Sequence, residues 1–240
     1  LIIGPLFAHS VRAVKPLAGA QGVNVLAFST DWNLAGGNTF IMGFLPFDQI
    51  QRLTQYLQTT DYKNIAVFTP NTNYGRTVLK TFGDIAPRYG ITLKQQQIFD
   101  PRRPNLNPDV KIFAQSAKVN QSTNTANINA VLLGTGGAQV ATISDLMTSN
   151  NLPPTMVRRL GTGLLDDPEL LRNESMNGAW FAAPNPDTRT NFEQKYMASY
   201  GRSAPRLSTL AYDATALAAI LAKRGLSNGD ANPFTRQAIM

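Results

Sequence analysis

The sequence of 240 residues contains no cysteine and only one histidine, His9. Without cysteine there can be no disulfide framework, no thiolate metal site and no cysteine nucleophile. A lone histidine cannot form a multi-histidine metal site. The apolar runs are too short to cross a membrane. The hydrophobic content of 43% excludes a disordered chain. The length allows one large domain or two modest ones.

Charge is also scarce, because Asp, Glu, Lys and Arg make up only 15% of the chain. The 22 basic and 15 acidic residues give a net charge of +7, which permits an anionic partner. The basic residues are scattered, however, with doublets only at 102–103, 158–159 and 223–224. A nucleic-acid groove needs a basic cluster with interleaved aromatic residues, so we expect no nucleic-acid partner.

Short apolar runs alternate with amphipathic segments along the whole chain. Strands are expected at residues 1–4, 23–29, 39–44, 63–70, 91–99, 130–135, 155–162 and 177–184. Helices are expected at residues 10–21, 47–58, 74–90, 108–119, 137–150, 188–201 and 206–225, with a polar connector at 120–129. This order indicates βαβ units with parallel strands buried on both faces, and therefore an α/β fold.

The segments that follow the expected strands are rich in Gly, Ser, Thr and Asn. In parallel sheets, ligands bind beyond the carboxyl ends of the strands, where helix amino termini leave N–H groups unpaired. These segments offer backbone N–H groups, hydroxyls and aromatic surfaces, which suit ligand binding better than acid–base chemistry. The predicted ligand-binding residues are Ala8, His9, Ser10, Ser29, Thr30, Asp31, Asn73, Tyr74, Thr135, Gly136, Thr162 and Gly163.

Two segments have the outline of a catalytic or cofactor motif. His9 and Ser10 are neighbours in sequence, which rarely face each other as base and nucleophile, and the chain has no G-x-S-x-G motif. "LLGTGGAQVA" resembles a dinucleotide loop but has Gln139 at the third glycine position, and the next strand carries Arg158-Arg159 instead of an acid. We interpret this loop as a tight strand-to-helix turn.

No phosphate loop of the form GxxxxGK[ST] is present either. Asp166 and Asp167 precede Pro168, which favours a helix cap over a catalytic pair. We therefore expect a protein that is not an enzyme and that has no cofactor and no metal.

Four segments, in their order along the chain, resemble a known family. They are "LIIGPLFAHSVRAVKPLAGAQGVNVLAFSTD", "NIAVFTPNTNYGRTVLKTFGDIAPRYGITL", "INAVLLGTGGAQVATISDLMTSNNLPPT" and "LSTLAYDATALAAILAKRG". Together they resemble the type I periplasmic binding proteins of the leucine/isoleucine/valine-binding family. Within this superfamily, "FIMGFLPFDQIQRLTQYL" and "VFTPNTNYGRTV" also resemble the penicillin-binding-protein activators, which stimulate peptidoglycan synthases.

The resemblance implies two lobes, each with a mainly parallel sheet flanked by helices. The first lobe would hold residues 1–44 and 187–240, and the second lobe residues 45–186. Ligand would lie in the cleft between the lobes, which would close by hinge motion.

The resemblance also implies roles for single residues, and this sequence departs from several of them. The serine that binds the ligand carboxylate in the family falls on Ala8, although Ser10 is close by. The threonine after the second strand aligns with Asp31, and the aromatic residue of the Y-G motif is kept as Tyr74. The acidic residue that holds the ligand ammonium falls on Gly163. Asp31 could supply an acid from the other lobe, or it could serve as a turn or capping residue.

Two functions follow from this resemblance, because the fold does not choose between them. The first is a periplasmic solute-binding protein that holds a small polar ligand, amino-acid-like or otherwise, and delivers it to an ABC transporter permease. The second is a regulator of cell-wall synthesis that contacts a peptidoglycan synthase and is lipid-anchored in its full-length form.

The opening "LIIG" is too apolar for a strand with nothing beside it. Family members begin with two further strand–helix units of about 30 residues each, so we expect this chain to be a fragment that lacks roughly 60 upstream residues. The first strand would then lie bare at a sheet edge or pair with a second copy in a dimer. The last segment, "NPFTRQAIM", is expected to stop within a helix.

Overall fold

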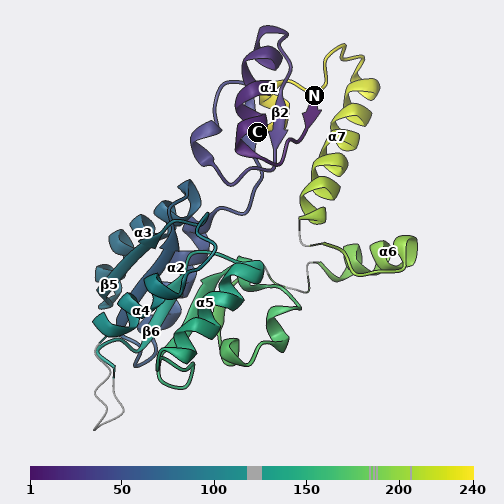
Figure 1. The fold of residues 1–240 in the computed structure, drawn as a ribbon. Coiled ribbons are helices and arrows are strands. Elements are labelled where there is room, and N and C mark those ends of the chain that lie inside the picture. Colours follow the sequence, from purple (N-terminus) through teal and green to yellow (C-terminus); the bar gives the residue numbers. More distant parts are fainter. Residues whose placement is uncertain (118–125, 184, 186, 188, 206) are drawn as a thin grey trace. The chain divides into compact units, whose positions relative to one another are not determined.

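The computed structural model describes residues 1–117, 126–183, 185, 187, 189–205 and 207–240. These residues form two compact units, one made of Leu1–Leu45 with Asn185–Met240 and the other of Pro46–Pro184. Figure 1 shows the order of the helices and strands along the chain. We call them the first and the second unit and describe each by itself.

The second unit is built on a five-stranded sheet in the order β5-β4-β6-β7-β8, in which every pairing is parallel. Its strands are β4 (Asn64–Pro70), β5 (Thr92–Phe99), β6 (Ala130–Leu133), β7 (Arg158–Thr162) and β8 (Trp180–Ala182). Its helices are α2 (Pro46–Gln58), α3 (Asn73–Ile85), α4 (Asn107–Ser116) and α5 (Gly137–Ser149), with 3₁₀ turns at η2 (Ala86–Tyr89), η3 (Gly163–Leu165), η4 (Leu170–Arg172) and η5 (Glu174–Met176).

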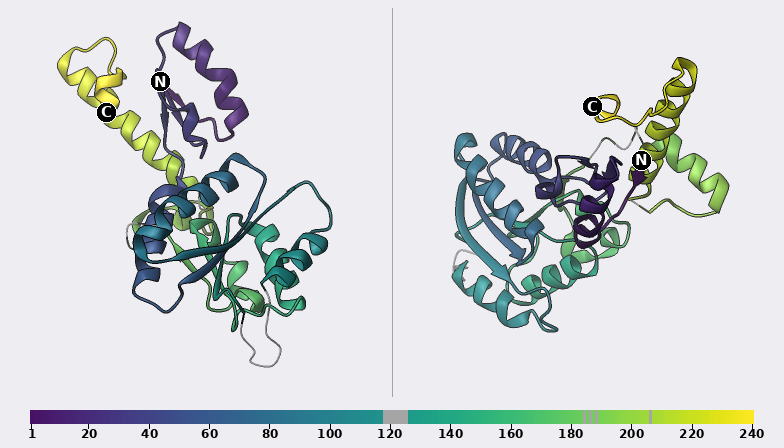
Figure 2. Two further views of the ribbon diagram at one scale, coloured as in Figure 1. Left: turned by 90° about the vertical axis from the view of Figure 1, so that its left-hand side faces the viewer. Right: turned by 90° about the horizontal axis from the view of Figure 1, so that it is seen from above.

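Helices cover both faces of this sheet, as the apolar runs predict. Along β4, Ile65 and Val67 point to the face packed by α2 and α3, whereas Ala66 and Phe68 point to the face packed by α4 and α5. Successive side chains of a strand alternate between faces, so a strand buried on both sides must be apolar throughout. Figure 2 shows the sheet between its two helix layers. The predicted α/β fold with parallel sheets flanked by helices is confirmed.

The first unit contains a smaller parallel sheet in the order β1-β2-β3. Its strands are β1 (Ile2–Ile3), β2 (Val25–Ala27) and β3 (Thr39–Ile41), and its helices are α1 (Ala8–Ala20), η1 (Trp32–Leu34), α6 (Thr190–Tyr200), α7 (Ser208–Asn228) and α8 (Arg236–Ile239). Val11 of α1 packs on Val25 and Ala27 of β2. β1 is an edge strand that pairs with β2 alone among the described residues, and Ile3 is 40% exposed.

Most of the expected elements agree with the structure, with differences at their ends. The helix expected at 74–90 ends as an α-helix at Ile85 and continues as the 3₁₀ turn η2, because Pro87 has no N–H to donate to the α-helical ladder. The short turns η1, η3 and η5 were not predicted, whereas the short helical stretch expected after Pro168 is present as η4. Most of the polar connector at 120–129, and residues 118–119, 184, 188 and 206 of other expected elements, lie outside the described residues.

None of the described helices is both long and apolar enough to serve as a membrane span.

Candidate functional site

In the second unit, the predicted site residues follow the carboxyl ends of three neighbouring parallel strands. β4, β6 and β7 pair in this order and end at Pro70, Leu133 and Thr162. The predicted residues at and after these ends therefore lie along one edge of the sheet, where α3, α5 and η3 begin. They are Asn73, Tyr74, Thr135, Gly136, Thr162 and Gly163.

A hydrogen bond joins two of these residues that are far apart in sequence. The hydroxyls of Tyr74 and Thr162 lie 2.7 Å apart, and either can be the donor. Thr162 is buried and Tyr74 is half-buried, so this pair connects the first turn of α3 to the end of β7. Each hydroxyl can both donate and accept a hydrogen bond, so the two hydroxyls can bond to a polar ligand in place of the hydrogen bond between them.

Gln49, in the first turn of α2, is a contact at this edge that sequence reasoning missed. Its side-chain oxygen accepts a hydrogen bond of 2.7 Å from the backbone N–H of Gly163. The side chain of Gln49 thus occupies the N–H of Gly163, the residue onto which the resemblance places the acidic ligand contact of the family. Only the general preference of helix starts for polar residues could have pointed to Gln49 from the sequence.

Gly136 lies where two segments approach closely. A Cβ at this position would come within 2.8 Å of both the Cβ and the backbone oxygen of Leu164 in η3. Thr135 donates its hydroxyl proton to the Oε1 of Gln139 at 2.7 Å. The segment after β6 is therefore a tight strand-to-helix turn, in agreement with the sequence interpretation.

Side-chain hydrogen bonds hold the amino terminus of α3 around Asn73. Thr72 caps the helix by accepting a 3.0 Å bond from the N–H of Gly75. Arg76 donates to the side-chain oxygens of Asn71 and Asn73, the latter at 2.7 Å. Arg76, which was not among the predicted residues, adds an exposed cation to this edge of the sheet.

In the first unit, Ala8, His9 and Ser10 form the first turn of α1. The N-cap residue Phe7 has an extended backbone and makes no side-chain capping bond. The first N–H groups of the helix therefore have no capping side chain as a partner. The ring of His9 stacks on that of Phe7 with centroids 5.8 Å apart, and Phe7 is 63% exposed. This turn presents an aromatic surface beside backbone donors.

The segment after β2 is held by its own side chains. Ser29 is buried, and its Oγ accepts a 3.0 Å bond from the N–H of Asp31, while Thr30 is exposed. Asp31 caps η1 by accepting from the backbone N–H of Asn33 at 3.3 Å. Its other oxygen forms an ion pair of 2.5 Å with Arg12 of α1. The structure thus gives Asp31 the turn and capping role that was one of the two alternatives.

Asp167 also serves a turn, because its Oδ1 accepts a 3.0 Å bond from the N–H of Glu169. Within the described ranges, no three His, Asp or Glu side chains come together as a metal ion would require.

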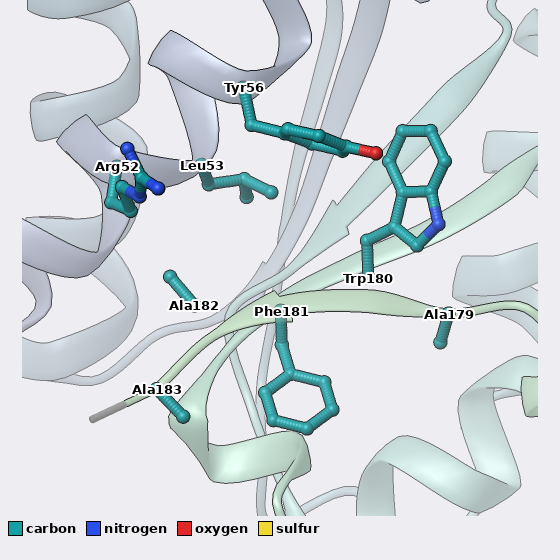
Figure 3. A pocket seen from close by; sticks show the side chains of 8 residues that line it. All are labelled: Arg52, Leu53, Tyr56, Ala179, Trp180, Phe181, Ala182 and Ala183. Atoms are coloured by element: carbon teal, nitrogen blue, oxygen red, sulfur yellow. The ribbon is translucent and has the colours of Figure 1, made fainter. Parts of the chain in front are cut away.

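A cavity of about 440 Å³ lies elsewhere in the second unit, between α2 and β8 (Figure 3). None of the predicted site residues lines it. The lining residues are Arg52, Leu53, Tyr56, Ala179, Trp180, Phe181, Ala182 and Ala183.

Comparison with known proteins gives one family and several similar structures. The family described as "Periplasmic binding protein" matches residues 1–240. An extracellular ligand-binding receptor from Rhodopseudomonas palustris HaA2 has a TM-score of 0.75 at 15% identity, covering 94% of this chain and 65% of that one. The leucine binding protein LivK from Thermotoga maritima has a TM-score of 0.69 at 21% identity, covering 93% and 64%.

A solute binding protein of an ABC transporter from Rhodopseudomonas palustris BisB5, in complex with 3,4-dihydroxybenzoic acid, has a TM-score of 0.71 at 15% identity. The matched region covers 91% of this chain and 60% of the BisB5 protein. The present chain thus spans less than two thirds of the length of these structures. The search of curated proteins finds no match.

Proposed function

The chain belongs to the periplasmic binding protein family, and on this premise we propose that it is a solute-binding protein that acts in the periplasm and delivers a small organic ligand to an ABC transporter. The observation that carries the proposal is the match of the family over residues 1–240. The solute-binding relatives named above support it, since they share this fold. Fold alone does not select a ligand, so the ligand must be argued from the side chains.

We propose that the strand-end residues predicted from the sequence contact this ligand. In the second unit they supply the hydroxyls of Tyr74 and Thr162, and the N-terminal turn of α3 adds the cation of Arg76. In the first unit they supply the first turn of α1. These groups bind oxygen atoms of a ligand by hydrogen bonds and favour negative charge near the helix amino termini.

The ligand that fits this set best is a small carboxylate without an ammonium group. Asp31 is the one acidic residue in the predicted set, and its charge is matched by Arg12 at 2.5 Å. Gly163 stands at the position of the family's acidic ligand contact. An amino acid would therefore leave its ammonium without a carboxylate partner, which is costly once water is removed. The relative that holds 3,4-dihydroxybenzoic acid is consistent with such a ligand class.

Calorimetric titration tests this proposal. We expect 3,4-dihydroxybenzoate to bind more tightly than L-leucine. Tyr74→Phe should weaken the binding by about three- to tenfold, because it removes one neutral hydrogen bond. Tyr200→Phe, a change of the same size on the exposed side chain of Tyr200 in α6, should leave the affinity unchanged.

Failure of the chain to bind any carboxylate or amino acid would contradict the proposal. Capture of a peptidoglycan synthase by the ligand-free protein would then support the cell-wall regulator instead.

A further inference from the structure

The cavity between α2 and β8 has the size and the walls of a small-molecule site. Its volume of about 440 Å³ lies within the range of ligand pockets, about 300–1,000 Å³. All of its lining residues belong to the second unit, and they come from α2 and the segment around β8. It involves none of the strand-end residues of the proposed solute site.

Aromatic contacts hold one wall of this cavity in place. The ring of Trp180 meets those of Tyr56 and Tyr62 edge-on, with centroids 5.1 and 5.0 Å apart. The guanidinium of Arg158 lies 4.5 Å from the Trp180 centroid and donates a 2.9 Å bond from its Nε to the hydroxyl of Tyr62. Because these contacts restrain the indole before any ligand arrives, little ordering cost would be left for binding.

The opposite wall provides the single charged group of the lining. Arg52 and Tyr56 are four residues apart on α2, so both project from one face of the helix. Figure 3 shows both side chains beside the cavity, with Leu53 between them. Arg52 is exposed, and no hydrogen bond or ion pair joins it to another of the described residues. Its planar guanidinium is therefore available, and its geometry matches that of a carboxylate.

A small residue leaves room between these two walls. Ala182 lies on the same side of β8 as Trp180, whereas Ala179 and Ala183 line the cavity from the other side of the strand (Figure 3), because successive side chains alternate between faces. The other long edge of β8 carries no strand in the described part of the chain. Phe181 adds a further ring, and it projects from β8 away from Trp180 (Figure 3). A flat ligand can thus contact aromatic surface while one end reaches the cation.

We propose that this cavity is a second binding site, for a planar aromatic carboxylate. The carboxylate pairs with Arg52, and the aromatic ring of the ligand packs against Tyr56 and Trp180. The site is independent of the proposed solute site, because the two share no residue.

Tryptophan fluorescence gives a direct test, because the chain has only two tryptophans, Trp32 and Trp180. In a Trp32→Phe background the emission reports on the cavity alone. The probe is 4-nitrobenzoate, a nitroaromatic quencher, with 4-nitrobenzylamine as its cationic counterpart and a Trp180→Phe variant to correct for absorption. We expect saturable quenching by the carboxylate and much weaker binding of the amine.

Arg52→Ala should weaken the carboxylate about ten- to hundredfold, as loss of a charge-assisted hydrogen bond implies. Arg88→Ala, an exposed arginine of the same unit, is the matched control and should change nothing. Tyr74→Phe should leave this quenching unchanged, which separates the cavity from the solute site. Absence of saturable quenching, equal quenching by the amine, or equal loss in Arg52→Ala and Arg88→Ala would overturn the proposal.

Discussion

Arg159 is the largest fully buried side chain of the described residues, and it has no carboxylate partner among them. Its guanidinium donates instead to the Oγ of Ser144 at 2.8 Å and to the backbone oxygens of Val157 and Leu152 at 2.7 and 2.6 Å. Burial lowers the pKa of Arg159 to about 10. That value is far above neutral pH, so the side chain stays charged and holds three segments of the second unit together.

Replacement of Arg159 by Met should destabilise the protein by about 2–5 kcal/mol, because the backbone oxygens of Val157 and Leu152 would stay buried without a donor. Urea unfolding of the two proteins measures this difference. Arg88→Met, on the exposed side chain of Arg88, should stay within about 0.5 kcal/mol of the wild type. Equal midpoints for all three proteins would mean that the buried network contributes nothing.

The same pKa fixes the sign of the pH dependence. Below about pH 10 the folded and unfolded states both hold the proton of Arg159, so this group adds no pH dependence near neutrality. Above that pH the unfolded state, with its higher pKa, binds more protons than the folded state. The contribution of Arg159 to stability then rises with pH.

At the scale of single elements, α3 shows how a helix start positions a candidate ligand contact. Thr72 has an extended backbone, and its hydroxyl accepts from the N–H of Gly75, which fixes the turn that carries Tyr74. The cap therefore determines where the hydroxyl of Tyr74 meets Thr162.

Thr72→Ala should lower the free energy of unfolding by about 1 kcal/mol, the usual cost of a lost N-cap. It should also weaken ligand binding, since Tyr74 loses part of its support. Thr77→Ala on the same helix removes a hydroxyl that donates to the backbone oxygen of Asn73 and caps nothing. That control should leave stability unchanged or slightly higher, and a loss equal to that of Thr72→Ala would argue against a capping effect.

At the scale of the whole molecule, the two units differ strongly in the size of their cores. In the described part of the chain, the second unit has clusters of 19 and 12 buried apolar residues on the two faces of its sheet. The first unit has one cluster of five, and α6 buries no residue. Since burial of apolar surface is the main stabilising term, the first unit should be the less stable of the two.

We therefore expect urea to unfold the first unit at a lower concentration than the second. Each unit holds one tryptophan, Trp32 in η1 and Trp180 in β8, so the variants Trp180→Phe and Trp32→Phe report on one unit each. Circular dichroism should show both transitions in either variant. Coincident transitions for the two probes would show instead that the units unfold as one.

The sequence by itself determined the class of the fold and the neighbourhood of the candidate site. Apolar runs such as residues 130–133 have to be buried on both faces, and this requires a parallel sheet between two helix layers. The carboxyl ends of parallel strands meet at one edge, so the sequence predicted that Tyr74 and Thr162 share an edge of the sheet. The strand order and the hydrogen bond between the two hydroxyls came from the structure. Sequence resemblance added the family, which the comparison confirmed.

Only the tertiary structure decided which partner each polar side chain has. Asp31 pairs with Arg12, 19 residues away, and Gln49 bonds to Gly163, 114 residues away. The cavity between α2 and β8 likewise joins segments that are far apart in the chain. Periodicity reports which face of an element is buried, but it carries no information on which distant element covers that face. Whether a charged side chain such as Asp31 can pair with a ligand depends on its distant partner, and only the folded structure shows that partner.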